Sequence, residues 1–301
     1  MIDEVAWLDT RLFAPRPAAA MEADALTRPG MTFVDVVGAR LRVRAQPGPG
    51  PTVVLLPDGP NTIEHYDPVF DRFAGRNAVL AVEIPGFGFS WASAPQALGF
   101  DGVVAAVIEA IDALAPASFI IVGACIQAYV AIAVAAARPD RVAGVVAGQA
   151  TDVAGFRRWI GRAIDPAGSL RVPIVGQLAW ARPENRHAMG ADAWYHAAAG
   201  PDIDVAPWRE LAHWSIDCGC SNALATVCQS WLPDDEWSPP VAQCPGVILF
   251  GTADRTHRHS DPEGLRAYLP NAVVRRLPRA GHFPELEALD TLDAAIAELS
   301  R

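Results

Sequence analysis

The sequence has little charge, few cysteines and no long apolar segment. Charged residues make up 19% of its 301 residues, whereas an average soluble protein has about 25%. No apolar run reaches the ~18 residues from which a membrane-spanning helix is built. The first residues are partly acidic and contain no basic segment followed by an apolar one, so we expect no signal peptide and a cytoplasmic location.

Basic residues are outnumbered, because the chain carries 24 Lys and Arg against 34 Asp and Glu, a formal net charge of −10. Binding to nucleic acid depends on Lys and Arg side chains that neutralise phosphates. Binding to an anionic membrane surface depends on the same side chains. We therefore expect a protein that binds neither nucleic acid nor a membrane.

Cysteine is scarce and odd in number, with five residues in a chain too long for a small secreted scaffold. A disulfide framework is therefore not expected. Cys218 and Cys220 stand near His213 and Asp217, which suggests a metal site. Two close cysteines without a second such pair are a weak metal signal, so we expect no metal and no cofactor.

Apolar runs and helical patterns alternate through the first half of the chain. Two β-rich runs, 32–37 and 39–45, flank Gly38 and predict a hairpin. The runs at 52–56, 78–82, 118–122 and 142–147 are apolar throughout, as expected for parallel strands covered on both faces. Helices are predicted between them, at 67–74, 102–114 and 127–137. The pattern predicts an α/β fold whose mostly parallel sheet has helices on both faces.

Strand runs disappear between 149 and 241, and the pattern there favours short helices joined by Pro-containing loops. Strands then return at 246–250 and 272–277, with helices at 262–268 and 286–299. We therefore predict a leader at 1–30, an α/β core formed by 31–148 and 242–301, and a helical cap at 149–241. Seven of the nine tryptophans fall in the predicted cap: Trp159, Trp180, Trp194, Trp208, Trp214, Trp231 and Trp237.

Cys125 stands where the buried strand at 118–122 passes into the helix at 127–137. A side chain on such a tight turn projects above the sheet edge, where the N–H groups of the new helix also point. The neighbouring residues must be small, and Gly123, Ala124 and Ala128 are. The position suits a nucleophile.

Four segments in order resemble motifs of the α/β-hydrolase superfamily, in its subgroup with a helical cap. GACIQ at 123–127 resembles the elbow Gly-x-nucleophile-x-Gly, and EIPGFGFS at 83–90 resembles the loop Asp-x-Pro-Gly-x-Gly-x-Ser. GTAD at 251–254 resembles the turn that carries the catalytic acid, and GHFPELE at 281–287 the segment that carries the catalytic histidine. The resemblance covers roughly residues 32–300 and implies the triad Cys125, Asp254 and His282.

The chemistry of these residue types agrees with that assignment. A free thiol has a pKa of ~8.5 and needs a base or a lowered pKa to act as a nucleophile. His282 can supply the base, and Asp254 can hold its second ring nitrogen. Asp152, which follows the strand at 142–147, is an alternative acid.

A cysteine in place of the usual serine changes the substrate that is expected. Thiolate is a good leaving group, so its attack on an ordinary alkyl ester tends to reverse, whereas a thioester or an enol lactone exchanges groups of similar quality. Dienelactone hydrolases are relatives that also use cysteine. We therefore expect an activated acyl substrate.

The oxyanion loop departs from the family pattern, in which a His-Gly-x-Pro loop gives the backbone N–H of x to the oxyanion hole. Here the loop at 57–61 reads PDGPN, so that Asp58 replaces the histidine and Pro60 falls at the donor position. Proline has no N–H. The N–H of Ile126 should remain as a donor, with Asn61 or another group replacing the second one. Alternatively, the loop is shifted by one residue and a different N–H points into the site.

The substrate site is expected to include Gln127, which stands where the family has glycine and either binds near the site or caps the turn. Trp159, Trp180, Trp194 and Trp214 are expected to line an aromatic or elongated acyl pocket. The segment that follows the predicted acid contains Arg255, His257 and His259, either as a solvated loop or as a site for a phosphorylated carrier such as coenzyme A.

Three functions remain open at this point. The first is hydrolysis of a thioester or activated ester through a Cys125 acyl-enzyme. The second is acyl transfer from a thioester of coenzyme A or a carrier protein to another small-molecule or carrier acceptor. The third is a binder, or a cyclase or lyase that reuses the pocket without hydrolysis. The first fits the predicted triad best, and a small-molecule acyl compound is the expected partner.

Overall fold

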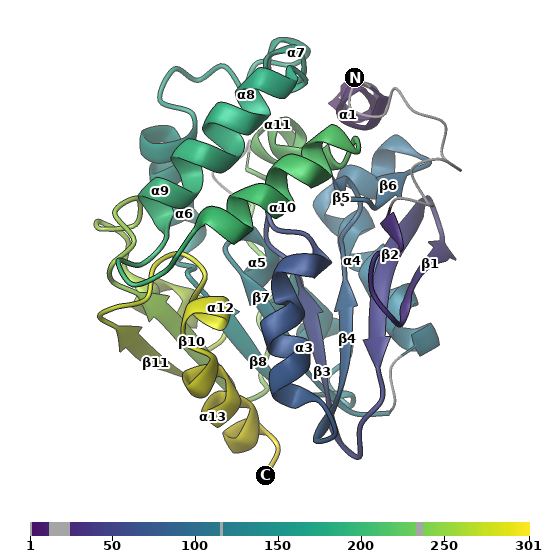
Figure 1. Cartoon of the computed structure of the whole chain (residues 1–301), viewed down its shortest axis with the longest axis vertical. Coiled ribbons are helices and arrows are strands. Elements are labelled where there is room, and N and C mark those ends of the chain that lie inside the picture. Colours follow the sequence, from purple (N-terminus) through teal and green to yellow (C-terminus); the bar gives the residue numbers. More distant parts are fainter. Residues whose placement is uncertain (1, 12–24, 115–116, 233–236) are drawn as a thin grey trace.

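The computed structural model describes residues 2–11, 25–114, 117–232 and 237–301. Much of the predicted leader, residues 12–24, lies outside this part of the chain. A nine-stranded sheet forms the centre of the described residues (Figure 1), in the order β1-β2-β4-β3-β7-β8-β10-β11, with β6 pairing to β2. Its strands are β1 (Met31–Val36), β2 (Ala39–Gln46), β3 (Gly50–Leu56), β4 (Asn77–Val82), β6 (Trp91–Ala92), β7 (Phe119–Ala124), β8 (Val142–Gly148), β10 (Gly246–Gly251) and β11 (Ala272–Leu277).

The direction of the strands confirms the predicted fold class. Strand β2 is antiparallel to β1, β4 and β6, and β1 and β2 form the predicted hairpin. The pairings from β4 through β3, β7, β8 and β10 to β11 are all parallel. Parallel strands end at the same edge, so the loops after β7, β8, β10 and β11 meet there.

Helices cover both faces of the sheet, as the apolar strand runs predicted. Along β3, Val54 and Leu56 pack in the core that contains helices α4 and α5, whereas Val53 and Leu55 pack in the core that contains α3 and α13. This alternation follows from the two-residue period of a strand. The helices are α3 (Asp67–Phe73), α4 (Phe100–Leu114), α5 (Ile126–Ala137), α12 (Pro284–Glu287) and α13 (Leu289–Leu299).

Helices also make up most of the chain between β8 and β10, and Figure 1 shows them gathered over one end of the sheet. The α-helices are α6 (Val153–Trp159), α7 (Val175–Trp180), α8 (Pro183–His187), α9 (Trp194–Ala198), α10 (Ala206–Asp217) and α11 (Leu224–Thr226). π-Helical turns follow three of them, at Ile160–Ile164, Ala188–Ala193 and Val227–Trp231.

Three sequence-based details differ in the structure. The region expected to lack strands contains β9 (Ser221–Asn222), which pairs with β5 (Phe87–Gly88). The single closing helix expected at 286–299 is two helices that meet at Ala288, whose φ of −133° ends α12. The helix expected at 262–268 is a 3-10 helix, Pro262–Ala267, and two more 3-10 helices are Ile63–Tyr66 and Pro95–Leu98.

Helix α1 (Ile2–Arg11) packs against α11. Its Asp9 carboxylate accepts the backbone N–H of Thr226 at 2.9 Å. The described part of the N-terminal segment is therefore attached to the helices above the sheet. None of the described helices combines the length and apolarity needed to cross a membrane.

Candidate active site

Cys125 lies at the turn between β7 and α5 in a left-handed backbone conformation, with φ 52° and ψ −121°. The turn needs a glycine two residues earlier, because a Cβ on Gly123 would stand 2.4 Å from the carbonyl oxygen of Gln127. The N–H of Cys125 donates to the carbonyl of Gly148 at 2.9 Å, which ties the turn to β8. The sulfur therefore sits in a fixed place at the carboxyl edge of the sheet, and Cys125 lines a cavity there.

His282 and Asp254 reach the same edge from the segments after β11 and β10. Nδ1 of His282 lies 2.7 Å from Oδ2 of Asp254, and both side chains are fully buried. The side-chain ligand atoms of His282, Cys125 and Asp58 lie within 4.8 Å of one another. The structure thus brings together the three residues of the predicted triad and adds Asp58 to them.

Besides His282, three other donors bind the Asp254 carboxylate. Its Oδ1 accepts the backbone N–H and the hydroxyl of Thr256, both at 2.7 Å, and its Oδ2 also accepts Nε2 of Gln149 at 3.1 Å. Burial would raise the pKa of Asp254, but attraction to His282 and these hydrogen bonds hold the pKa below its usual value. Asp254 is therefore a carboxylate at neutral pH.

Gln149 is a residue of the site that the sequence did not reveal. It follows β8 with φ 43°, and its side-chain amide both donates to and accepts from the backbone of Gly251, at 3.1 and 2.8 Å. It thereby joins the ends of β8 and β10 next to Asp254. A lone glutamine after an apolar run matches no motif, so only the fold identifies it.

The thiol of Cys125 and the imidazole of His282 both have raised pKa values. Burial, and then the negative charge of Asp58, raise the pKa of the Cys125 thiol to about 12, although His282 and the N–H of Ile126 act in the other direction. Burial would lower the pKa of His282, but Asp254 and Asp58 raise it well above its usual value. The resting site therefore holds a thiol beside an imidazolium.

Asp58 faces the other nitrogen of the imidazole. Its Oδ2 lies 3.6 Å from Nε2 of His282, an ion-pair distance that is too long for a hydrogen bond. The residue is 3% exposed. Burial raises the pKa of Asp58, and its interactions with His282 and Cys125 partly offset that rise.

The expectation that Asn61 or another group replaces the second oxyanion donor stays a prediction, since the side-chain Nδ2 of Asn61 has no hydrogen-bond partner among the described residues. The N–H of Asn61 is already used, because it donates to the carbonyl of Asp58 at 2.8 Å and closes a turn. Pro60 lines the cavity but has no N–H. The N–H of Gly59 faces the Asp58 carboxylate instead, and Gly59 also lines the cavity. The N–H of Gly59 is thus directed at a side chain of the loop itself, and the alternative of a shifted register stays a prediction.

One oxyanion donor comes from the elbow. Ile126 is the first residue of α5 and lines the cavity, and its N–H lies close enough to Cys125 to favour the thiolate. Gln127, in contrast, is not a substrate-binding residue, and that prediction is wrong. Its side chain is fully buried and donates from Nε2 to the carbonyl of Pro57 at 3.1 Å, which braces the oxyanion loop against the elbow.

An apolar cavity of about 260 Å³ lies between this edge of the sheet and the helices above it. Among the described residues that line it, Asp58 alone carries a charged side chain. Trp159, Trp180 and Trp194 line it as predicted, whereas Trp214 does not. The ring of Trp214 packs against Phe89 at 5.4 Å and does not line the cavity, so the prediction for Trp214 is wrong.

Other candidates from the sequence have structural roles. The Asp152 carboxylate accepts the N–H of Gly155 at 2.5 Å and caps α6, so Asp254 is the acid on His282. His213 pairs with Asp192 at 3.0 Å, and the Cys220 thiol donates to Ser215 at 3.4 Å. These contacts account for His213 and Cys220 without a metal.

The segment after Asp254 is only partly a solvated loop. Arg255 and His259 are exposed, as expected, but His257 is 1% exposed. Its ring stacks on Trp159 at 4.3 Å and lies 5.1 Å from His282. Burial, and then the positive charge of His282, lower the pKa of His257 to about 3.

Two groups of described side chains have the residue types of a metal site. The ligand atoms of Asp58, Cys125 and His282 lie within 4.8 Å of one another, and so do those of Asp254, His257 and His282. Cysteine, histidine and carboxylate all bind zinc. Both groups include His282, whose Nδ1 already bonds to Asp254. The sequence predicts no metal here, and a chelator tests that prediction.

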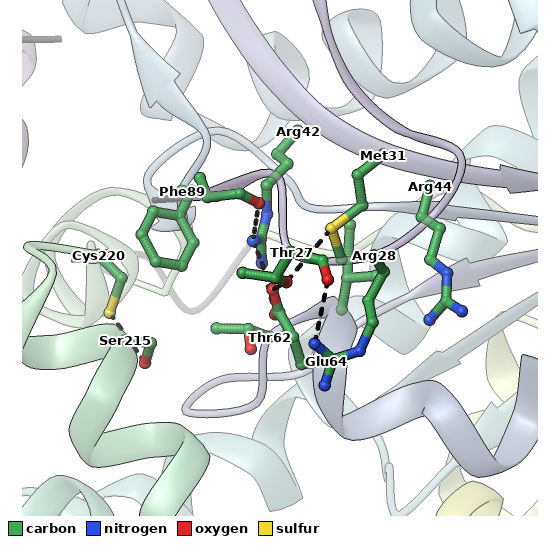
Figure 2. A network of polar contacts seen from close by, with 12 residues as sticks. Thr27, Arg28, Met31, Arg42, Arg44, Thr62, Glu64, Phe89, Ser215 and Cys220 are labelled. Carbon is green, nitrogen blue, oxygen red and sulfur yellow. Dashed lines mark hydrogen bonds and ion pairs between the residues drawn. The ribbon is translucent and has the colours of Figure 1, made fainter. Parts of the chain in front are cut away.

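A buried ion triad fixes the loops on the other side of the site (Figure 2). The Arg42 guanidinium is fully buried and contacts Glu64 at 2.8 Å and Glu83 at 2.5 Å. Glu83 also accepts the N–H of Phe89 at 2.7 Å, and a Cβ on Gly88 would stand 2.3 Å from its carboxyl carbon. The glycine and the acid of the 83–90 motif are therefore parts of one packed unit.

The comparison that decides the family is with models of protein families. Residues 53–295 match the model described as the alpha/beta hydrolase family. The chain belongs to the alpha/beta hydrolase family. No curated protein matches this alpha/beta hydrolase in sequence.

Solved structures with the same fold include several epoxide hydrolases. Epoxide hydrolase A from Mycobacterium thermoresistibile has a TM-score of 0.72 at 19% identity, over 90% of this chain and 98% of that one. An epoxide hydrolase from Bacillus megaterium in complex with an inhibitor has a TM-score of 0.68 at 16% identity, over 89% of this chain and 99% of that one. The epoxide hydrolase VrEH1 from Vigna radiata has a TM-score of 0.69 at 17% identity, over 89% and 96%. At these identities the likeness is one of fold.

Proposed function

We propose that this alpha/beta hydrolase cleaves a thioester or an activated ester through an acyl-enzyme on Cys125. The observation that carries the proposal is the meeting of Cys125, which lines the apolar cavity, with His282 and Asp254 buried behind it. A nucleophile, an acid–base group and an orienting carboxylate are the parts that covalent acyl transfer requires.

The reaction starts when the Cys125 sulfur attacks the acyl carbon and gives up its proton. The oxyanion that forms accepts a hydrogen bond from the N–H of Ile126, a cavity-lining residue at the start of α5. The leaving group departs with a proton, and the acyl group remains on sulfur. Water then attacks the thioester carbon, the acid is released and the thiol is restored.

The cysteine also argues against the reaction named for the structural neighbours. A thiolate that opened an epoxide would form a thioether, whose carbon–sulfur bond carries no acyl carbon for water to attack. The enzyme would stay alkylated after one event. Epoxide hydrolysis by this chain would therefore need a nucleophile other than Cys125.

The cavity suggests the part of the substrate that it binds. At about 260 Å³ it lies just below the ~300–1,000 Å³ of typical ligand pockets, and its wall is mostly aromatic and aliphatic. It suits a small apolar acyl group. Arg162 donates to the carbonyl of Thr256 at 3.2 Å, and Arg255 donates to that of Ala197 at 3.4 Å. Thr256 and Ala197 line the cavity, so both arginines lie beside it. Their positive charges suit the phosphates of a coenzyme A or carrier-protein thioester from the cytoplasm.

Intact-protein mass spectrometry after mixing with acyl N-acetylcysteamine thioesters of increasing chain length tests the proposal. We expect a mass increase equal to one acyl group on the wild type and none on Cys125→Ala. Prior treatment with a chelator should change nothing. An acyl mass that also appears on Cys125→Ala, or diol formation from a styrene oxide arm without any acylation, would contradict the proposal.

Transfer of the acyl group to an acceptor other than water is the competing function, and the burial of the Cys125 sulfur supports it. Cys125 is 4% exposed in a mainly apolar cavity, where water is scarce. The preformed acyl-enzyme should be followed in water alone and with added amines, alcohols and thiols. Release of free acid at an unchanged rate supports hydrolysis, whereas a much faster loss with one acceptor supports transfer.

A further inference from the structure

Asp58 occupies the cavity wall next to both reacting side chains of the proposed triad. We propose that Asp58 is a catalytic base, which takes the proton of the Cys125 thiol while His282, as imidazolium, protonates the leaving group. This inference rests on the proposed acyl-enzyme function. It assigns acid and base to separate side chains, where a simple cysteine–histidine pair would use one imidazole for both.

The geometry places Asp58 within reach of the thiol proton. Its carboxyl oxygen, the Cys125 sulfur and a ring nitrogen of His282 lie within 4.8 Å of one another, and Asp58 and Cys125 line the same cavity. The backbone of Asp58 is fixed, since its N–H donates to the hydroxyl of Tyr66 at 3.4 Å and its carbonyl accepts the N–H of Asn61 at 2.8 Å. A base must be close to the proton that it takes, and no other carboxylate lines this cavity among the described residues.

The imidazole is poorly placed to be the base. Nδ1 of His282 bonds to Asp254 at 2.7 Å, and Nε2 faces the second carboxylate, Asp58, at 3.6 Å. Two flanking carboxylates favour the imidazolium, and the raised pKa of His282 agrees. An imidazolium has no lone pair for a proton. Nε2 has no hydrogen-bond partner among the described residues, so its N–H is not committed to another acceptor.

The proton balance closes over a full cycle. In acylation the bond from sulfur to the acyl carbon forms, the bond to the leaving group breaks, the thiol proton goes to Asp58, and the Nε2 proton of His282 goes to the leaving group. In deacylation the neutral imidazole takes a proton from the attacking water, and protonated Asp58 returns its proton to the departing sulfur. The site ends as it began, with a thiol, a carboxylate and an imidazolium.

Other titratable groups surround Asp58 and must be controlled in any pH experiment. His282 and Cys125 face it from the elbow side, and their charges act on it directly. Tyr66 and Glu285 lie behind it, with the Tyr66 hydroxyl donating to Glu285 at 3.0 Å. Burial raises the pKa of Glu285 to about 7, and the Asp58 charge adds to that rise. The charge of Asp58 also acts on a fifth group, the hydroxyl of Tyr195 in α9.

Two rates measured on Asp58→Asn test the proposal, because they should move in opposite directions. The first is alkylation of Cys125 by iodoacetamide from pH 6 to 10, which reports the thiolate and needs no substrate. The negative charge of Asp58 raises the pKa of the thiol, so its removal should speed alkylation at pH 8 by about tenfold or more. The second is acylation by a hexanoyl N-acetylcysteamine thioester, which should slow by ~10²–10⁴-fold because the base is lost.

The acid limb of the acylation profile gives a further readout. In the wild type acylation should fall at low pH as Asp58 becomes protonated, and Asp58→Asn should lack that limb. Glu285→Gln, which removes the titrating group behind Tyr66, should keep both the limb and the wild-type acylation rate within a few fold. Asp58→Glu should recover part of the lost rate, because it restores a carboxylate.

The outcomes separate this inference from the proposed function. If Asp58→Asn is acylated as fast as the wild type or faster, Asp58 is not the base and His282 alone is. Slower alkylation together with slower acylation would show that Asp58 only supports the structure, and would also overturn the inference. A folded wild type that no thioester acylates would instead refute the acyl-enzyme function, and the base role with it.

Discussion

Gln149 donates from Nε2 to the same carboxylate oxygen of Asp254 that holds the imidazole of His282, at 3.1 and 2.7 Å. The amide of Gln149 is itself fixed by two hydrogen bonds to the backbone of Gly251. Because β8 and β10 are neighbours, the Gln149 side chain reaches from the end of β8 to the end of β10 and fixes the orientation of the Asp254 carboxylate. Gln149 is therefore a positioning residue for the proposed acid.

Replacing this amide by an isosteric apolar side chain should reduce turnover without reducing substrate binding. Gln149→Met removes the hydrogen bond to the charged Asp254, worth ~1.5–3 kcal/mol, and also the two bonds to the backbone of Gly251 that fix the strand ends. We therefore expect kcat to fall by ~10–100-fold with KM nearly unchanged. Steady-state kinetics on the thioester that acylates Cys125 best provide the measurement. Gln229→Met is a matched control, since Gln229 bonds only to Gln177 and to backbone carbonyls away from the cavity edge. A KM effect as large as the kcat effect would assign Gln149 to the pocket instead.

The three residues of the proposed triad should respond unequally to substitution. Cys125→Ala should abolish both the acyl-enzyme and turnover, and His282→Ala should slow acylation by ~10²–10⁴-fold. Asp254→Asn should be less harmful than either, because Thr256 and Gln149 still fix the side chain while the imidazole loses its charged partner. Single-turnover acylation followed by mass measures all three. Full activity in Cys125→Ala would require a non-covalent reaction.

Tryptophans of the predicted cap that line the cavity should affect substrate choice, whereas those outside it should not. Trp180 lines the cavity and its ring nitrogen has no hydrogen-bond partner within the described residues, so Trp180→Ala enlarges the cavity at no polar cost. The preferred acyl chain should lengthen by several carbons. Trp214→Ala is the control, because Trp214 packs on Phe89 outside the cavity. The ratio of kcat/KM for decanoyl over butyryl thioesters is the measurement, and an equal change in both variants would place the acyl group elsewhere.

The residues that form the strands and the triad were open to prediction because their signals are local. Strand β11 has the predicted bounds, and the turn at Cys125 follows from a buried strand, small residues and a helix in direct succession. His282 and Asp254 each lie in a short motif after a strand, and parallel strands deliver such segments to one edge.

The contacts that the sequence concealed all depend on loop conformation or on pairs far apart in the chain. Asp58 could be seen as a replacement, but not as a neighbour of His282, which is 224 positions later. Gln127 stood next to the nucleophile in sequence, yet the first turn of α5 directs its amide to Pro57 and away from the cavity. The turn from Asp58 to Asn61, in which the N–H of Asn61 is used, likewise could not be predicted from the residue types alone.

The buried ion triad should be a strong determinant of stability. Removal of the cation in Arg42→Met leaves two carboxylates, Glu64 and Glu83, buried without compensation, which should cost ~3–5 kcal/mol of unfolding free energy. Urea denaturation at pH 7 measures the loss. Arg72→Met, at the surface pair with Asp293, should cost less than ~1 kcal/mol.

Removal of all three charges distinguishes electrostatics from packing in this triad. The combined variant Arg42→Met, Glu64→Gln and Glu83→Gln leaves no buried charge in the triad, so it should be more stable than Arg42→Met alone. An equal or lower stability in the combined variant would mean that the hydrogen bonds to the 83–90 loop, and not the charges, carry the effect.

His257 should make the protein less stable in mild acid, and its removal should weaken that dependence. Its pKa is about 3 in the folded protein, because burial and then His282 disfavour the imidazolium, against about 6.5 when unfolded. Between these values the unfolded chain binds a proton that the folded one does not, so this contribution is complete above pH 6.5 and is lost as pH falls towards 3. Between pH 7 and pH 5 the contribution of His257 to the free energy of unfolding changes by about 2 kcal/mol.

His257→Phe keeps a ring against Trp159 and removes this contribution. Its unfolding free energy should therefore fall by about 2 kcal/mol less than that of the wild type over this interval. Urea denaturation at the two pH values gives the difference, in which the other titrating groups, His65, Asp9 and Glu285, are common to both proteins. His259→Phe, at an exposed position two residues away, should behave as the wild type does. An identical fall in His257→Phe and the wild type would show that His257 is protonated in the folded protein, and that the imidazoles of His257 and His282 share a positive charge beside Asp254.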